Sequence, residues 1–151
     1  MRILIQRVSE AKLHIDGDLQ AEIAKGLVVF LGVNQEDSSS DIDYLVKKLI
    51  NLRIFSDAEG KMNLSLQDIS GELLLVSQFT LFASTKKGNR PSYIRSAKPP
   101  IAEKLYDLFI QETEYKLNRK IQTGVFGADM KVALVNDGPV SIWIDSKDRE
   151  Y

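Results

Sequence analysis

Apolar and polar side chains alternate along much of this chain, and a period of two residues predicts a protein built mainly of β-strands. An Asp-Gly pair within residues 16–18 favours a tight hairpin turn between two early strands. The run GLVVFLGV at residues 26–33 is apolar throughout, which is typical of a strand covered on both faces. The pattern predicts strands at residues 2–8, 11–15, 19–24, 26–33, 52–55, 71–84, 120–126, 131–135 and 140–145, with a bulge at Ser9-Glu10.

Two segments change to the helical period. The apolar side chains of the first fall on one helix face: Ile42, Leu45, Val46, Leu49 and Ile50. Either Ser40 or Asp41 is suited to cap the N-terminus of this helix. The second helix opens at Pro99-Pro100, because proline is well tolerated in a first turn. Its expected apolar stripe is Ile101, Leu105, Leu108 and Phe109.

This order of elements predicts one α+β domain over residues 1–151, with a strongly curved, barrel-like β-sheet and two helices packed outside it. The composition, 44% hydrophobic and 27% charged, is ordinary for a soluble globular protein. The N-terminus has the pattern of a strand rather than of a signal peptide. No apolar run approaches the ~20 residues that cross a bilayer, so we expect a cytoplasmic protein.

Composition also narrows the chemistry. Cysteine is absent, which excludes disulfides and thiolate metal sites. The one histidine, His14, lies within the first strand pattern, and nothing in the sequence places a nucleophile beside it. No carboxylates fall at metal-ligand spacing, and no glycine-rich phosphate loop is present. We therefore expect no metal and no cofactor.

The net charge of −1 argues against binding nucleic acid by bulk attraction for phosphate. Residues 84–98 (STKKGNRPSYIRSAK) are nevertheless strongly basic, with five cations and no acid. The five are Lys86, Lys87, Arg90, Arg95 and Lys98. This segment is either a solvated loop or a local patch that faces phosphate groups.

Polar residues interrupt the strongest strand pattern, at VSQFTLF. Buried polar groups such as Ser77, Gln78 and Thr80 cost ~1–3 kcal/mol each unless they are paired. They either form a polar pocket at a strand end or bond to a neighbouring loop. Because a hydroxyl nucleophile needs a base to activate it, the chemistry left for such a pocket is stabilisation of developing negative charge by backbone amides and small hydroxyls.

A second unusual stretch is NDGPVS at residues 136–141. Glycine gives conformational freedom, whereas proline fixes φ and removes a donor, so Gly138-Pro139 predicts a rigid exposed corner. This corner is either a simple hairpin turn or a contact for a substrate.

Together, SQFTL at 77–81 and NDGPVS at 136–141 resemble the paired signature of the D-aminoacyl-tRNA deacylases. The likeness continues through IQRVSEAKLHIDGD, GLVVFLGV, NLRIFSDAEGKMNLSL and KKGNRPSY, and covers essentially the whole chain. It implies hydrolysis of the ester that joins a D-amino acid to the 3′ end of tRNA, as a proofreading step. It also implies a homodimer with active sites at the subunit interface.

The resemblance further implies roles for single residues. Ser77, Gln78, Phe79 and Thr80 would line the pocket, with N–H groups near Phe79 and Thr80 as oxyanion donors. Thr80 as a nucleophile is the alternative, which we consider weaker because no base is in evidence. The ribose 2′-OH of the tRNA would assist the reaction, and Lys86, Lys87 and Arg90 would contact the tRNA.

In that family the Gly-Pro peptide is cis and reaches into the partner's pocket. Gly138 and Pro139 would then offer carbonyls to the substrate's α-ammonium group and reject the L-enantiomer by backbone alone, while glycyl-tRNA would be cleaved. Arg7 would hold this corner, or else form a surface salt bridge. Two other functions stay open: a non-catalytic nucleic-acid-binding dimer of the same fold, and a general esterase with Ser77 or Thr80 as nucleophile.

Overall fold

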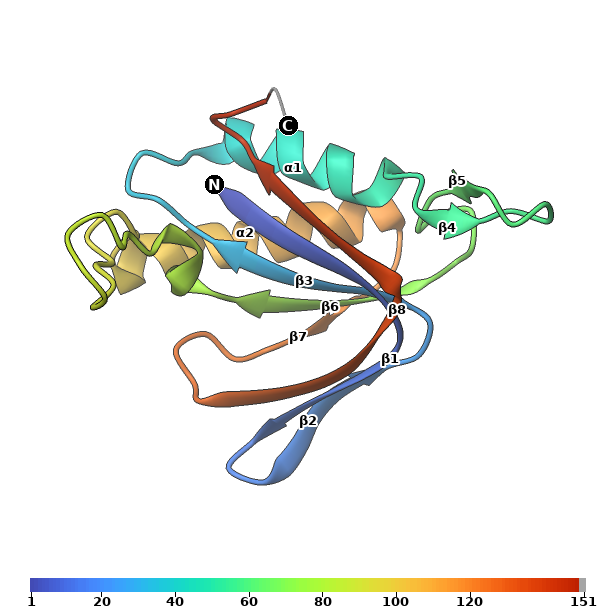
Figure 1. Ribbon diagram of the computed structural model, residues 1–151, viewed down its shortest axis with the longest axis horizontal. Helices are drawn as coiled ribbons and strands as arrows, with labels where there is room; N and C mark the ends of the chain where they lie inside the picture. Colours follow the sequence, from blue (N-terminus) through green and yellow to red (C-terminus); the bar gives the residue numbers. More distant parts are fainter. Residues whose placement is uncertain (150–151) are drawn as a thin grey trace.

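The computed structural model describes residues 1–149 and contains a curved six-stranded sheet, a small two-stranded sheet and two α-helices (Figure 1). The large sheet is formed by β1 (Arg2–Ile15), β2 (Asp18–Ile23), β3 (Gly26–Gly32), β6 (Glu72–Ser77), β7 (Gln122–Thr123) and β8 (Met130–Asp145). The small sheet pairs β4 (Phe55–Ser56) with β5 (Met62–Leu64). The helices are α1 (Ser39–Asn51) and α2 (Pro99–Leu117), and a 3₁₀ turn, η1, spans Phe79–Phe82.

The long strand β1 organises the sheet. Its first half pairs with β3 and its second half with β2, while β8 runs antiparallel along its other edge over nearly its full length. β6 and β7 then extend the sheet in parallel beyond β3. β2, the second half of β1 and the part of β8 paired with that half curl under the rest (Figure 1), so the sheet is nearly closed. The predicted α+β class with a barrel-like sheet and two helices is confirmed.

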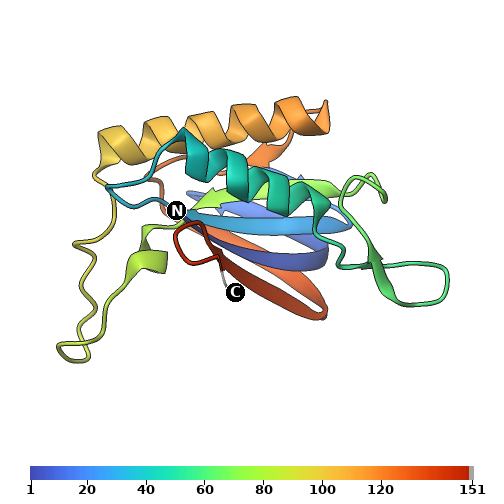
Figure 2. The same cartoon turned by 90° about the horizontal axis from the view of Figure 1, so that it is seen from above.

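Alternation along the central strands produces two apolar cores. In β3, Leu27, Val29 and Leu31 belong to the core that the helices cover, whereas Val28 belongs to the core inside the curled sheet. Both helices lie on the same face of the sheet (Figure 2). β3 is therefore buried on both faces, as its continuous apolar run predicts.

The predicted strand at 71–84 is wrong after Ser77. The N–H of Gln78 still donates to the Leu31 carbonyl at 2.7 Å, but β3 ends at Gly32 and offers no further ladder. The chain then turns back on itself, and Leu81 N–H donates to the Gln78 carbonyl at 3.3 Å. The side chains beyond Ser77 consequently do not alternate between two faces as a strand would require.

The ends and faces of the helices also need correction. α1 is capped by Ser38, not by Ser40 or Asp41, and the Asp41 carboxylate accepts the Ser38 N–H at 2.9 Å from inside the first turn. In α2, Ile101 and Leu108 are 49% and 36% exposed, although they were expected in the core. The face that packs on the sheet and on α1 is displaced, and its buried residues are Ala102, Leu105, Tyr106, Phe109 and Thr113.

Four predicted strands have other bounds. The segment 52–55 contributes only Phe55 to β4, and 120–126 shrinks to the two residues of β7. The predicted strands 131–135 and 140–145 form one strand, β8, because both follow β1. The bulge predicted at Ser9-Glu10 is confirmed at Ser9, since Val8 pairs with Asn136 and Glu10 with Val135.

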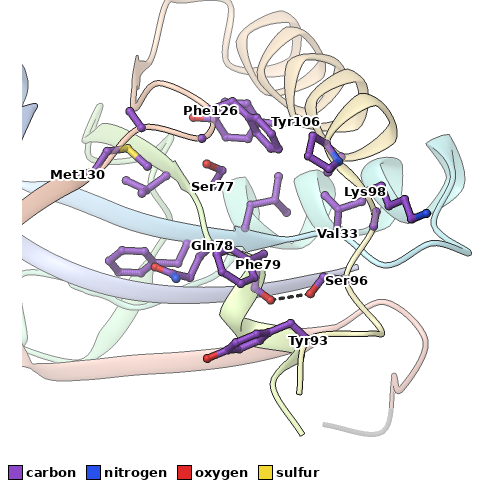
Figure 3. A pocket seen from close by; sticks show the side chains of 18 of the residues that line it. Val33, Ser77, Gln78, Phe79, Tyr93, Ser96, Lys98, Tyr106, Phe126 and Met130 are labelled. Carbon is purple, nitrogen blue, oxygen red and sulfur yellow. Dashed lines mark hydrogen bonds between the residues drawn. The ribbon is translucent and has the colours of Figure 1, made fainter. Parts of the chain in front are cut away.

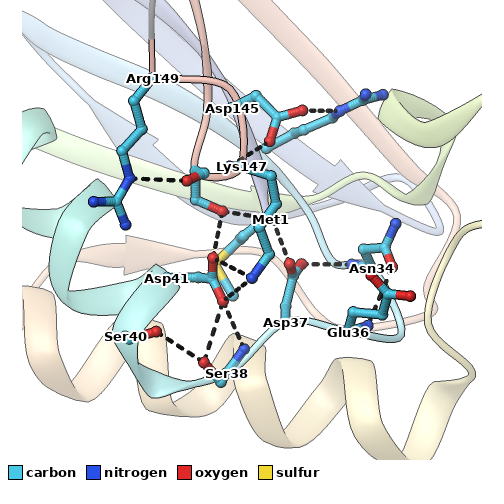
Figure 4. A network of polar contacts seen from close by, with 12 residues as sticks. Met1, Asn34, Glu36, Asp37, Ser38, Ser40, Asp41, Asp145, Lys147 and Arg149 are labelled. Carbon is cyan, nitrogen blue, oxygen red and sulfur yellow. Dashed lines mark hydrogen bonds and ion pairs between the residues drawn. The ribbon is translucent and has the colours of Figure 1, made fainter.

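A group of polar residues around buried Asp41 and Ser146 joins β1, β8 and the start of α1, and we call it the N-terminal cluster: Met1, Asp37, Asp41, Ser146 and Lys147 (Figure 4). The Met1 ammonium donates to Asp37 Oδ1 at 2.5 Å and to Ser146 Oγ at 2.8 Å. Ser146 Oγ donates to Asp41 Oδ1 at 2.7 Å, and Lys147 Nζ lies 3.0 Å from Asp41 Oδ2.

The environment of Asp41 sets its protonation. Burial raises the pKa of this carboxyl, but the hydrogen bonds it accepts from Ser146, Lys147 and the Ser38 backbone outweigh burial and lower the pKa to about 2. Asp41 therefore stays ionised although it is only 2% exposed. Within residues 1–149, no buried side-chain nitrogen or oxygen lacks a hydrogen-bond partner. In the same range, neither α-helix has the length and apolar character needed to span a bilayer.

Candidate functional site

A pocket of about 610 Å³ opens at the carboxyl end of β6 (Figure 3). Its walls come from β6, the start of η1, the start of α2 and the loop that leads into β8. The interior is mostly apolar, and its lining includes Phe30, Val76, Ala102, Tyr106, Phe126, Met130 and Val132. Its polar edge is formed by Ser77, Gln78 and Ser96. A deep apolar pocket with a few polar groups on one side is typical of a small-molecule site.

Three of the four residues expected to line the pocket do so: Ser77, Gln78 and Phe79. Thr80 lies in the adjoining η1 turn and is not a wall residue. Its hydroxyl oxygen accepts a hydrogen bond from Gln78 Nε2 at 2.6 Å. The side chains of Gln78 and Thr80 thus bond to each other, which gives both polar groups a partner.

The backbone of η1 leaves two donors unused. Among the hydrogen bonds of the described residues, the N–H groups of Phe79 and Thr80 have no acceptor within the chain. The first N–H groups of any helical turn lack an internal carbonyl partner. Two neighbouring free donors beside a pocket are suited to an oxygen atom that gains negative charge.

Aromatic side chains frame this edge; Phe79 was expected there, whereas Tyr93 and Tyr106 were not predicted as pocket residues. Phe79 is 57% exposed and meets Tyr93 edge-to-face with ring centroids 5.0 Å apart. The Tyr106 hydroxyl donates to the Leu75 carbonyl at 2.9 Å, and burial raises its pKa well above the ordinary value. The apolar stripe expected for α2 included Leu105 but not its neighbour Tyr106. Placing the buried face at 102, 105, 106 and 109 would have revealed it.

The Gly-Pro corner is an insertion into the β1–β8 ladder. Gln6 pairs with Ser141 and Val8 with Asn136, so four residues of β8, 137–140, stand opposite Arg7 alone. The Gly138-Pro139 peptide is cis, and both residues are exposed. The corner is therefore a large bulge within one strand, not the turn of a hairpin.

Arg7 supports this bulge from beneath. It is only 8% exposed, and its Nε donates to the Asp137 carbonyl at 3.0 Å. Its Nη1 donates to the carbonyl of Ile54, which lies outside the ladder. A Cβ built on Gly138 would lie 2.7 Å from Arg7 Nη2, and φ at Gly138 is +127°. Only glycine suits this position as it is built.

Asn136 also supports the corner and was missed from the sequence. Its Oδ1 accepts the Val140 N–H at 2.8 Å, and its Nδ2 donates to Ser141 Oγ at 2.9 Å. Asn136 thus bridges the two ends of the bulge. An asparagine two residues before a glycine-proline pair is suited to side-chain to backbone bonding, and this pattern could have suggested the role of Asn136.

One chain does not bring the corner and the pocket together. Arg7 pairs with Leu27 on β3, whereas Ser77 pairs with Leu31, four residues further along the same strand. At ~3.3 Å per residue the two sites are ~13 Å apart along the strand direction alone. The corner is absent from the pocket wall as well.

The basic segment 84–98 projects from the body beside η1 (Figure 2). A pair of backbone bonds between Ser84 and Ser92, both of 2.9 Å, closes its base. Lys86, Lys87 and Arg90 are exposed, and among residues 1–149 none of the three has a salt-bridge partner.

Two free amide donors thus lie in the η1 turn beside the pocket, and the basic segment 84–98 projects from the same region. The sequence matches the family model described as D-Tyr-tRNA(Tyr) deacylase over residues 4–145. It is 56% identical over 150 residues to a D-aminoacyl-tRNA deacylase of Flavobacterium psychrophilum, covering 99% of this chain and 100% of that protein. A Flavobacterium johnsoniae D-aminoacyl-tRNA deacylase is 55% identical over the same shares of both chains.

The chain belongs to the D-aminoacyl-tRNA deacylase family. It is accordingly a hydrolase of D-aminoacyl-tRNA that serves proofreading, as the resemblance implies.

Solved structures share the fold. One, titled c-Myc DNA unwinding element binding protein, superposes with a TM-score of 0.92 at 36% identity and covers 96% of this chain and 98% of its own. A second, titled as a probable eukaryotic D-amino acid tRNA deacylase, has a TM-score of 0.81 at 15% identity, with 95% and 97% covered. At that identity the second likeness concerns the fold alone.

Proposed function

We propose that the ester is hydrolysed at the polar edge of the pocket, with the N–H groups of Phe79 and Thr80 as oxyanion donors. The observation that carries this proposal is that both donors are free while the neighbouring backbone groups of the turn are bonded. Water attacks the ester carbonyl carbon, and the carbonyl oxygen becomes negatively charged as the tetrahedral intermediate forms. The bond to the tRNA oxygen then breaks and releases the D-amino acid.

The reaction needs little from side chains. The Thr80 hydroxyl accepts from Gln78 at 2.6 Å, and no histidine lines the pocket to remove its proton. In this mechanism the terminal 2′-OH of the tRNA assists proton transfer, so the enzyme acts on RNA and not on a DNA analogue.

Lys86, Lys87 and Arg90 bind the tRNA backbone through their exposed charges. We place this reaction in the cytoplasm.

The Gly138-Pro139 corner is proposed as the chiral filter, supplied by a second copy of the chain. Three observations support this: the corner is exposed, it lies far from the pocket of its own chain, and β8 has no partner along its outer edge within residues 1–149. β8 also carries two exposed apolar side chains, Val135 at 51% and Trp143 at 40% exposure. A homodimer would cover them and bring each corner to the other pocket.

A backbone filter accounts for broad substrate choice. The corner offers carbonyl oxygens that can accept the substrate's α-ammonium group, and it has no long side chain that could read the amino acid. An L-configured Cβ would point into this wall, whereas the hydrogen of glycine would not. Glycyl-tRNA is therefore a substrate in this proposal.

Replacing Gly138 by alanine tests the filter. The added Cβ would lie 2.7 Å from Arg7 Nη2 and 2.9 Å from Val140 Cγ2 at a φ of +127°, so the corner or the side chains that hold it must shift. We expect hydrolysis of D-tyrosyl-tRNA to fall about 100-fold, since displacement by ~1 Å can cost that much, and the preference for the D-ester over the L-ester to narrow. Gly60→Ala is the control, because Gly60 also has a positive φ, +77°, but its Cβ would meet nothing within 4 Å.

Rates are measured with D-tyrosyl-, L-tyrosyl- and glycyl-tRNA after circular dichroism shows that both variants are folded. Unchanged discrimination in folded Gly138→Ala would refute the filter. Equal cleavage of the D- and L-esters by the unmodified protein would leave the hydrolase but remove the chiral role of the corner.

The non-catalytic alternative has one observation in its favour, because the 36% identical structure is titled as a DNA unwinding element binding protein. A binding role for this chain would use the same basic segment, residues 84–98. The comparison of tRNA esters above decides it, since a binding protein without turnover leaves both esters intact.

A further inference from the structure

Two side chains from outside the η1 turn hold its carbonyl groups. Arg2 Nη1 donates to the Leu81 carbonyl at 2.9 Å, and Ser96 Oγ donates to the Phe79 carbonyl at 2.9 Å (Figure 3 shows the second bond). The carbonyl of Thr80, between them, accepts an N–H from the end of the turn itself. The carbonyls of Phe79 and Leu81 are thus bonded to side chains from outside the turn, and the Thr80 carbonyl between them is bonded within the turn.

Arg2 is itself firmly held. Its Nε donates to Asp145 Oδ2 at 2.7 Å, and its guanidinium carbon lies 4.4 Å from the ring centre of Phe82 and 5.3 Å from that of Trp143. The side chain is 21% exposed. A planar guanidinium that stacks on rings and bonds in its own plane has little freedom to move. Arg2 therefore connects the turn to the paired ends of β1 and β8.

Ser96 is fixed from the other side. It forms an isolated bridge with Asn34, and the next residue, Ala97, donates its N–H to the Val33 carbonyl at 2.8 Å. Ser96 is thus anchored to the backbone that continues from β3. The two side chains approach η1 from different elements and from both of its ends.

The geometry of the peptide group links these contacts to the free donors. In a trans peptide the C=O of one residue and the N–H of the next lie in one plane and point in opposite directions. The bond from Ser96 to the Phe79 carbonyl therefore sets the direction of the Thr80 N–H. The bond from Arg2 to the Leu81 carbonyl keeps the far end of the turn from unwinding.

We infer that Arg2 and Ser96 are positioning residues that orient the free N–H groups of Phe79 and Thr80 for the reaction. The inference rests on the proposed role of these groups as oxyanion donors. Neither residue needs to touch the substrate for this purpose.

The test uses Arg2→Met, which keeps an apolar stem without the guanidinium, Ser96→Ala, and the double variant. Arg149→Met is the matched control, because Arg149 also stacks on an aromatic ring, Tyr44 at 4.3 Å, and donates to a backbone carbonyl, that of Ser146 at 3.1 Å. For each protein, kcat and KM with D-tyrosyl-tRNA are measured beside hydrogen exchange of the Leu81 and Ala83 amides, whose bonds close the turn.

Each single substitution is expected to lower kcat about 10-fold with KM nearly unchanged, because misdirected donors act on the transition state and not on binding. Exchange at Leu81 and Ala83 should rise at least about 10-fold, since local opening of the turn becomes easier.

Arg2→Lys should recover part of kcat through one remaining donor. The double variant should lose less than the product of the single losses, because both side chains hold one turn. Arg149→Met should match the wild type in kcat and in exchange.

Unchanged exchange in both single variants would overturn the positioning role, whatever happens to kcat. A rise in KM at constant kcat would also overturn it and assign Arg2 to tRNA contact. Faster exchange with unchanged kcat would show that the turn is held but that its amides do not set the rate, and the oxyanion role proposed for Phe79 and Thr80 would then be wrong.

Discussion

The N-terminal cluster and the η1 turn both lie where strands of the large sheet end, but their polar groups are satisfied differently. In the cluster, the Asp41 carboxylate accepts from Ser146, Lys147 and Ser38 and is 2% exposed. In the turn, the N–H groups of Phe79 and Thr80 have no acceptor within the described chain.

The difference separates stability from chemistry. Groups that are already paired contribute to folding and have nothing to offer a substrate, whereas free donors in a pocket contribute little to folding and can bind a developing charge. Substitutions in the cluster should therefore lower the free energy of unfolding and leave kcat unchanged. Substitutions in the turn should lower kcat and leave the free energy of unfolding nearly unchanged.

The largest expected effect on stability comes from Asp41→Ala. It leaves the buried Ser146 hydroxyl without its acceptor and removes the partner of the Lys147 ammonium, which is 54% exposed. An unsatisfied buried polar group costs about 1–3 kcal/mol. Urea unfolding measures the loss. Asp43→Ala is the control on the same helix, because Asp43 is exposed and its loss should stay within about 0.5 kcal/mol. A large fall in kcat for folded Asp41→Ala would contradict the separation.

Acid should break the cluster selectively. The folded pKa of Asp41, about 2, lies below its unfolded value, so its contribution is present at neutral pH and is lost as the pH falls from about 5 towards 2. A shift of this size corresponds to about 2 kcal/mol. Wild type and Asp41→Asn are compared by urea unfolding at pH 7 and pH 3. The gap between them should narrow at pH 3, and a constant gap would show that the Asp41 charge contributes nothing.

The smallest effect is expected at the Thr80 hydroxyl. Thr80→Val removes it but keeps the shape and the backbone N–H, so kcat should stay within about 3-fold if the amide is the donor. Thr80→Ser, which retains the hydroxyl, is the matched variant. A fall of about 100-fold or more in Thr80→Val, with Thr80→Ser active, would make the hydroxyl the catalytic group and refute the amide mechanism.

The sequence predicts the elements better than it predicts the site. The apolar run at 26–33 and the face of α1 follow from periodicity, because burial alone decides them. The end of β6 could not be predicted, since SQFTLF continues a strand pattern and only the end of β3 stops the ladder. Among the pocket residues, Phe126 lies in the loop before β8 and Met130 is the first residue of β8, so their positions depend on the curl of that strand. Arg7 was found through resemblance, and its contact with Ile54 is visible only in three dimensions.

The pairing of β1 with β8 has a consequence for the chain during its synthesis. The two strands cover residues 2–15 and 130–145, so more than a hundred residues separate partners that lie side by side. One edge of β1 stays open until β8 has left the ribosome, and such distant pairing is slow to form. We expect the nascent chain to expose this edge for most of its translation, which makes it a natural binding site for chaperones that recognise extended segments.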